Sequence, residues 1–168
     1  MRKAIILILL SAAFATAAFG QLTKQIESIR AEVGQINKNA PKYKKRTGNV
    51  EGISLEGTEA TFFTSGRGLK KITAKIFGET FRATAELYFS EEEIIFGYRK
   101  FERYDTQLGV NPPPKVAKVT ETRVYFVGEK AVRVIDHKTI LPNASRRFGE
   151  LESEMKELVK KLKDAYLN

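Results

Sequence analysis

Residues 81–89, Phe-Arg-Ala-Thr-Ala-Glu-Leu-Tyr-Phe, decide the fold because apolar and polar side chains alternate along them. A period of two residues is that of a β-strand with one buried face. The preceding stretch, residues 69–77, repeats the alternation with Ile72, Ala74 and Ile76 on its apolar side. The two stretches therefore predict neighbouring strands that share one apolar face.

Further strand-like stretches lie on both sides of this pair. They cover residues 94–104, 116–127 and 131–136, with weaker ones near residues 50–55 and 59–64. Short turns rich in Gly, Ser and Glu separate most of them, and strands joined by such turns pair as antiparallel neighbours. The exception is the Pro-rich loop 106–115. The middle of the chain is predicted to be an antiparallel β-meander of five to seven strands.

An amphipathic helix is predicted on each side of this meander, from apolar residues that recur at spacings of three and four. In the first helix these are Leu22, Ile26, Ile29, Val33 and Ile36, and in the second Phe148, Leu151, Met155, Leu158, Leu162 and Tyr166. Pro41 ends the first pattern, and Asn143 or Ser145 can cap the start of the second. Because a meander with one apolar face needs a cover, we expect an α+β fold with the N-terminal and C-terminal helices packed on one face.

Residues 1–20 differ in composition from the rest of the chain. Arg2 and Lys3 precede an apolar run from Ala4 to Phe19, and no acidic residue comes before Glu27. This order is typical of a secretory signal peptide, and the run is shorter than the roughly 20 residues that span a bilayer. We predict a bacterial-type signal peptide in residues 1–20, cleaved after residue 20 or after residue 17. A single α+β domain in residues 21–168 would then be periplasmic or extracellular, with no transmembrane span after cleavage.

The composition excludes several kinds of chemistry. The 168-residue chain has no cysteine and a single histidine, which rules out disulfides, cysteine-ligated metals and a cysteine nucleophile. The dense carboxylate group Glu91-Glu92-Glu93 lacks the spacing of a calcium loop and is interpreted as a solvated hairpin turn. No metal and no cofactor is predicted.

Asp136 and His137 are the residues that suggest catalysis. Neighbours in a strand point to opposite faces, so Asp136 is not expected to orient His137 as a triad would require. A solvent-open cavity lined by polar groups beside His137 would favour an enzyme, whereas a packed interior with an exposed His137 would argue against one.

Basic residues concentrate in one segment, which accounts for much of the formal net charge of +9. The candidate polyanion-binding residues are Lys38, Lys42, Tyr43, Lys44, Lys45 and Arg46. Such a segment can bind an anionic lipid head group, lipopolysaccharide, a teichoic or polyphosphate chain, or nucleic acid, and secretion disfavours nucleic acid. The alternative is a solvated connector. The expected partner is an anionic component of the cell envelope or a protein.

Five motifs together resemble a loose family of small exported bacterial proteins of unknown function. They occupy residues 29–32, 86–89, 94–96, 121–126 and 132–136, reading Ile-Arg-Ala-Glu, Glu-Leu-Tyr-Phe, Ile-Ile-Phe, Glu-Thr-Arg-Val-Tyr-Phe and Val-Arg-Val-Ile-Asp. The resemblance covers about residues 26–136 and implies a leading helix followed by antiparallel hairpins. It carries no active-site residue with it.

Three functions stay open at this point. The first is a non-enzymatic binding or interaction module, with a ligand between the concave sheet face and the helices or across the basic segment. The second is a small secreted hydrolase that uses Asp136 and His137. The third is a stoichiometric inhibitor of a secreted enzyme, which inserts the stiff loop 106–115.

Overall fold

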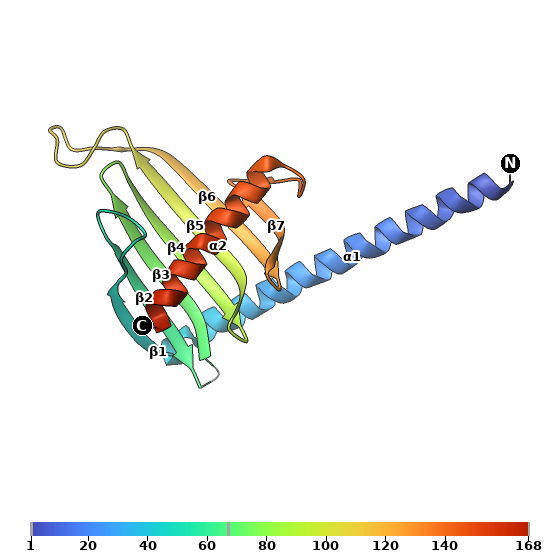
Figure 1. Cartoon of the computed structure of the whole chain (residues 1–168), viewed down its shortest axis with the longest axis horizontal. Coiled ribbons are helices and arrows are strands. Elements are labelled where there is room, and N and C mark those ends of the chain that lie inside the picture. Colours follow the sequence, from blue (N-terminus) through green and yellow to red (C-terminus); the bar gives the residue numbers. More distant parts are fainter. Residues whose placement is uncertain (1, 67, 168) are drawn as a thin grey trace.

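The computed structural model describes residues 2–66 and 68–167, and the side chains of residues 2–19 lie outside this description. Its centre is one antiparallel sheet of eight strands in the order β1-β2-β3-β4-β5-β6-β7-β8, flanked by two long helices (Figure 1). The strands are β1 (Lys44–Asn49), β2 (Thr58–Ser65), β3 (Gly68–Gly78), β4 (Phe81–Ser90), β5 (Glu93–Tyr104), β6 (Val116–Val127), β7 (Lys130–Asp136) and β8 (Thr139–Ile140). The helices are α1 (Arg2–Asn39), the short 3-10 helix η1 (Ala40–Lys42) and α2 (Arg146–Leu167).

The alternation in residues 81–89 produces the predicted strand. In β4, Ala83, Ala85 and Leu87 are buried on one face, and they pair with Ile76, Ala74 and Ile72 of β3. The antiparallel meander is therefore confirmed. The number of strands is eight rather than five to seven, because β1 and the two-residue β8 carry no apolar alternation and form by pairing with their neighbours. The weak strand expected at residues 50–55 is a loop.

Helix α2 covers one face of the sheet, which we call the α2 face. It crosses the strands diagonally, as Figure 1 shows. Its buried side chains are Phe148, Leu151, Met155, Leu158, Val159 and Leu162. They form one core with the buried apolar residues of strands β2, β3, β4, β6 and β7. Burial of this continuous apolar surface is the main stabilising contribution of the fold.

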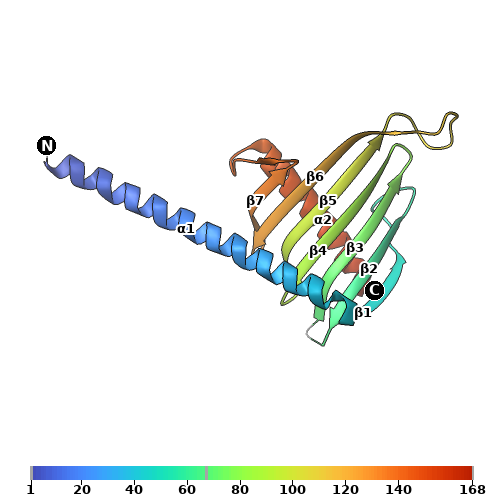
Figure 2. The ribbon, with the colours of Figure 1, turned by 180° about the vertical axis from the view of Figure 1, so that it is seen from behind.

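Helix α1 packs on the opposite face, which we call the α1 face, so the prediction that both helices share one face is wrong (Figure 2). Its residues Ile26 and Ile29 pack on Tyr125. Tyr125 follows Val124 in β6, whose side chain points to the α2 face, and successive strand residues point to opposite faces. The physical reason is that the sheet has a second, smaller apolar patch. It consists of Ile95, Phe96, Tyr125, Val132 and Ile135.

Residues 2–20 of the predicted signal peptide, residues 1–20, make up the first half of α1. Most of its side chains lie outside the described part of the structure, so the cleavage site stays a prediction. This part of the helix extends beyond the sheet (Figure 1). Within the described residues, no helix is both long enough and apolar enough to cross a membrane.

Candidate functional site

An apolar groove opens on the α2 face where the diagonal course of α2 leaves one end of the sheet uncovered. We call it the end groove, and its volume is about 330 Å³. Its lining residues are Ile53, Ile76, Phe81, Ala83, Arg99, Phe101, Glu154, Glu157, Leu158 and Lys161. They come from the loop before β2, from strands β3, β4 and β5, and from α2. The groove thus lies between the sheet and a helix, which is one of the two places where the sequence predicts a ligand.

Two aromatic rings form one wall of the end groove. The rings of Phe81 and Phe101 stack with their centroids 4.9 Å apart. Gly78 allows this arrangement, because a Cβ atom at that position would collide with the ring of Phe81. Both phenylalanines are only half-buried, so a flat apolar surface stays accessible from solvent.

Charged side chains line the rim of the end groove on the side of α2. Arg99 of β5 pairs with Glu154 of α2 at 2.6 Å, and Lys161 pairs with Glu157 at 3.0 Å. Each pair holds one positive and one negative group, so the rim presents both signs. The groove has an apolar floor and a polar border, as is usual in small-molecule sites.

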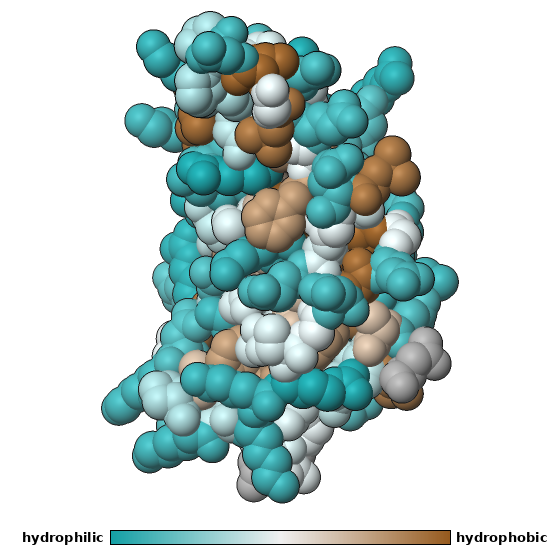
Figure 3. Space-filling model, turned by 90° about the vertical axis from the view of Figure 1, so that its left-hand side faces the viewer, coloured by the Kyte–Doolittle hydropathy of each residue, from teal (hydrophilic) through white to brown (hydrophobic). Residues whose placement is uncertain are grey.

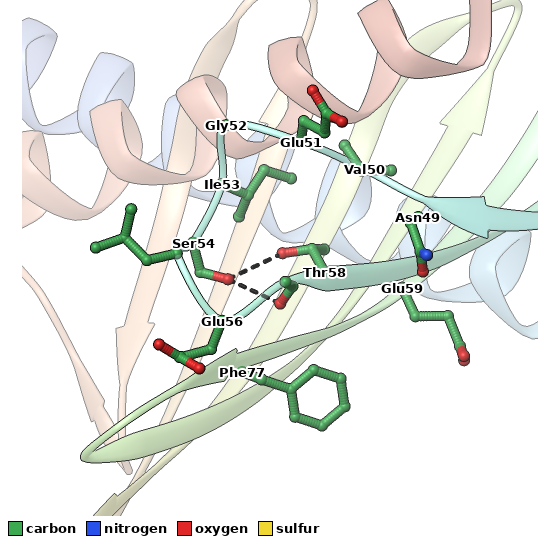
Figure 4. Close-up of a pocket in the computed structure, with 12 residues that line it drawn as sticks. Asn49, Val50, Glu51, Gly52, Ile53, Ser54, Glu56, Thr58, Glu59 and Phe77 are labelled. Carbon is green, nitrogen blue, oxygen red and sulfur yellow. Dashed lines mark hydrogen bonds between the residues drawn. The ribbon is translucent and has the colours of Figure 1, made fainter. Parts of the chain in front are cut away.

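A second hollow lies in the loop 50–57 next to the end groove (Figure 4). Ile53 lines both hollows. Ser54 shapes the loop, because its hydroxyl donates to the carbonyl of Gly57 at 2.8 Å and lies 3.4 Å from the hydroxyl of Thr58. Since one loop and Phe77 provide nearly the whole lining, this hollow is a property of the loop.

Exposed apolar side chains also lie on the loops at the end of the sheet that holds the end groove. Backbone hydrogen bonds from Phe77 to Gly57 (3.0 Å) and from Leu108 to Glu79 (2.8 Å) bring three loops side by side. The large apolar residues exposed on these loops and the adjoining strand ends are Leu55, Phe77, Leu108, Val110 and Val116. Figure 3 shows apolar side chains among polar ones at this end of the molecule.

The predicted basic segment lies along one edge of the sheet. Lys38 is near the end of α1, Lys42 is in η1, and Lys44, Lys45 and Arg46 begin strand β1. The four lysines are exposed, and in the described part of the chain none of them has an ion pair. The half-buried Tyr43 connects η1 to β1. The structure thus brings these residues together, and their binding of a polyanion stays a prediction.

Arg46 has a structural role within this segment. Its guanidinium donates to the carbonyl of Ala165 at 3.1 Å and also to that of Tyr166, and it lies over the rings of Phe62 and Tyr166. A cation at these last carbonyls stabilises the C-terminus of α2. Arg46 is therefore less free to bind a ligand than the four lysines.

Asp136 and His137 lie apart from the end groove. His137 is exposed in the turn between β7 and β8 with a positive φ of 59°. Asp136 Oδ2 accepts from Arg147 Nε at 3.0 Å. An open hollow beside both residues has a lining that includes Thr120 and Thr139. This hollow keeps the hydrolase as an alternative, although in the described part Asp136 bonds Arg147 and the His137 side chain makes no hydrogen bond.

The loop proposed for an inhibitor projects from the sheet between β5 and β6 (Figure 1). Its base is closed by a hydrogen bond from the Asp105 N–H to the Lys115 carbonyl (3.0 Å) and by one from the Lys115 N–H to the Asp105 carboxylate (2.8 Å). Leu108 and Val110 are exposed on it. Inhibition of an enzyme stays a prediction.

A polar cluster that sequence reasoning missed ties the end of α1 to the sheet. Lys71 Nζ donates to Glu86 Oε2 at 2.7 Å and to Asn37 Oδ1 at 2.9 Å. The Tyr88 hydroxyl donates to Glu86 and also lies 3.1 Å from Asn37 Oδ1. Burial alone would raise the pKa of Glu86, but hydrogen bonds from Lys71 and Tyr88 lower it below its ordinary value. Burial likewise opposes charge on Lys71, yet its bond to Glu86 raises its pKa. The cluster is a charged, hydrogen-bonded clamp.

Comparisons with known protein families, with curated proteins and with solved structures found no match. Among the residues that the structure describes, no three His, Asp or Glu side chains come together in a way that could hold a metal ion.

Proposed function

We propose that this chain is an exported, non-enzymatic binding protein that takes a small apolar ligand into the end groove. The observation that carries the proposal is the half-buried pair of stacked rings, Phe81 and Phe101, at the open end of an otherwise covered sheet face. When a ligand covers apolar surface in a hollow, the removal of that surface from water favours binding by about 25 cal/mol per Å². A volume of about 330 Å³ suits a small molecule.

The chemistry of the lining supports binding over catalysis. Ile53, Ile76, Ala83 and Leu158 complete the apolar surface, and the charged groups stand at the rim. Among the residues that line the groove there is no serine, threonine, tyrosine or histidine. The other side chains that serve as nucleophiles are carboxylates and lysine, and those of the groove, Glu154, Glu157 and Lys161, are each held in an ion pair.

The test is binding of Nile red, an uncharged fluorophore that brightens in apolar surroundings. The wild-type chain without residues 1–20 should bind it saturably. Ala83→Phe places a ring on the floor of the groove and should weaken binding by about tenfold or more, which equals 1.4 kcal/mol. Phe77→Ala is the matched control, because this exposed phenylalanine does not line the groove.

Three outcomes decide the proposal. Loss of binding in Ala83→Phe, with normal binding in Phe77→Ala and cooperative unfolding of both variants, supports it. Equal binding by all three proteins places the probe elsewhere and rejects the groove. Hydrolysis of ester substrates that His137→Ala abolishes would favour the hydrolase instead.

A further inference from the structure

Strand β1 is an open edge of the sheet, and this is a second surface that the end groove does not involve. β1 pairs only with β2, and all six of its residues are exposed. An edge strand presents unpaired backbone N–H and C=O groups to which another strand can bind.

The register identifies which backbone groups are free. The N–H of Val50 donates to the carbonyl of Thr58 at 2.8 Å, and the β1–β2 pairing continues the same register to Lys44 and Thr64. In an antiparallel ladder, hydrogen-bonded and non-hydrogen-bonded pairs alternate. The N–H and C=O groups of Lys45, Thr47 and Asn49 therefore point away from β2. No hydrogen bond to them exists in the described part of the chain.

The opposite edge of the sheet is protected. β8 pairs with the last residues of β7, Ile135 and Asp136. Farther along β7, the N–H of Ala131 donates to Glu152 of α2 at 3.0 Å, and Val134 accepts from the N–H of Leu141 at 3.0 Å. The fold thus covers one edge with side-chain and loop contacts and leaves β1 uncovered.

The charge of β1 distinguishes between the strands that could join it. Lys44, Lys45 and Arg46 follow one another, and residues 38–49 contain no acidic side chain. Two copies of the chain joined at β1 would gather Lys44, Lys45 and Arg46 of both copies in one short ladder that contains no acidic side chain, and like charges this close repel each other. A strand with acidic residues opposite positions 44–46 gains both the ladder and the ion pairs.

We infer that β1 binds an extended acidic segment of a partner protein by strand addition. Main-chain hydrogen bonds to Lys45, Thr47 and Asn49 supply the ladder, and Lys44 and Lys45 select acidic side chains on both sides of the added strand. A soluble polyanion such as polyphosphate offers the charge without the ladder, which separates the two kinds of partner experimentally.

The probe is a capped peptide, Thr-Val-Thr-Glu-Glu-Glu, of the same six-residue length as β1. Bound antiparallel, it places its glutamates opposite residues 44–46. Two N-methylated forms with identical charge provide the decisive comparison. One is methylated on the alternate amides that face β1, and the other on the amides that face away.

We expect methylation of the facing amides to weaken binding by about tenfold or more, because several ladder hydrogen bonds are lost together. Methylation of the outward amides should change the affinity by less than about threefold, because those amides make no hydrogen bond to β1. Polyphosphate should compete weakly. Equal affinity of the two methylated peptides, or failure of the unmethylated peptide to bind, would overturn the inference.

Two variants of the protein test the same point from the other side. Thr47→Pro removes one outward N–H and the exposed hydrogen bond between the Thr47 and Thr61 hydroxyls (2.9 Å). It leaves the backbone hydrogen bonds to β2 in place, because proline is tolerated where the N–H of an edge strand faces solvent. It should weaken peptide binding with little change in the unfolding midpoint. Lys45→Glu should weaken binding further, whereas Lys24→Glu, an exposed lysine on α1, is the charge-matched control. Polyphosphate binding that Lys45→Glu removes and Thr47→Pro spares, without peptide binding, would instead assign the segment to polyanions.

Discussion

Helix α2 packs closely on Gly97 of β5, where Met155 lies against the glycine backbone. The substitution Gly97→Ala tests this packing. A Cβ atom at Gly97 would lie 2.6 Å from Sδ and 2.9 Å from Cγ of Met155, whose side chain is 1% exposed. Both distances are shorter than van der Waals contact, so Met155 must move within a filled core.

The expected magnitude combines two opposing effects. Overpacking of a core costs about 1–3 kcal/mol. Replacing a strand glycine by alanine stabilises the protein by about 0.5–1 kcal/mol, because alanine loses less conformational entropy on folding. Gly97→Ala should therefore lower the free energy of unfolding by about 1 kcal/mol, within a range of about 0–2.5 kcal/mol.

A double-mutant cycle with Met155→Ala isolates the contribution of the contact between positions 97 and 155. Met155→Ala alone should cost about 2–5 kcal/mol, because it leaves a cavity under α2. In that background the added methyl group enters vacated space, so Gly97→Ala should be neutral or stabilise by about 0.5–1 kcal/mol. The coupling energy between the two sites is then about 1–3 kcal/mol, within the range measured for residues in contact.

Urea unfolding followed by circular dichroism provides the free energies. Gly48→Ala in β1 is the matched control, because a Cβ atom there meets nothing within 4 Å. The reasoning is refuted if Gly97→Ala behaves like Gly48→Ala, or if its effect is the same with methionine and with alanine at position 155.

Three further predictions concern other contacts of the fold. Because the pKa of Glu86 is lowered in the folded state, its pairing with Lys71 stabilises the protein above the ordinary carboxyl pKa of 4.5, and this stability is lost as the pH falls through the lower folded value. Glu86→Gln should therefore flatten the acid limb of a plot of stability against pH. Arg46→Met removes the cation at the C-terminus of α2 and should cost about 1 kcal/mol, with faster amide exchange in the last turn of the helix. Glu91 and Glu92 have positive φ values of 49° and 69°, so Glu91→Asn combined with Glu92→Gly should raise the free energy of unfolding by about 1–2 kcal/mol.

Each of these has a clear contrary result. An acid limb that is unchanged in Glu86→Gln would show that the clamp on α1 does not titrate as described. Exchange in α2 that is unaffected by Arg46→Met would remove its role as a helix cap. If Glu91→Asn combined with Glu92→Gly makes the protein less stable, the contacts of the two glutamate side chains contribute more than the positive φ values cost.

The sequence predicted the sheet well because β3 and β4 bury one face along their whole length. The alternation of Ile72, Ala74 and Ile76 with polar residues leaves only one arrangement in which the apolar side chains are covered. In β5, Arg99 and Phe101 alternate with Tyr98 and Lys100, and both line the groove on the α2 face, where Arg99 meets Glu154 of α2.

The side on which α1 packs could not be predicted from its own residues. An amphipathic stripe shows that a helix covers an apolar surface, but it does not identify that surface. The signal was in the strands, where Ile94, Ile95 and Phe96 are apolar at consecutive positions. Both faces of β5 must therefore be covered there, and Tyr125 and Ile135 extend the second patch.

The candidate site depended on tertiary pairing that composition does not encode. Phe81 and Phe101 lie twenty residues apart and meet only because β4 and β5 pair in a particular register. Strand β1 lacks apolar alternation entirely, so Lys44, Lys45 and Arg46 resembled a solvated connector. Pairing with β2 and the contacts of Arg46 with α2 make it a strand.

The central claim, a ligand in the end groove, is tested most directly by methyl NMR of the isoleucines during titration with Nile red. Ile53 and Ile76 line the groove, whereas Ile26 and Ile29 are buried under α1 on the other face and serve as internal references. If the ligand occupies the end groove, the Ile53 and Ile76 methyl signals shift saturably and those of Ile26 and Ile29 stay unchanged. Shifts confined to the isoleucines under α1, or no saturable shift in any of them, would contradict it.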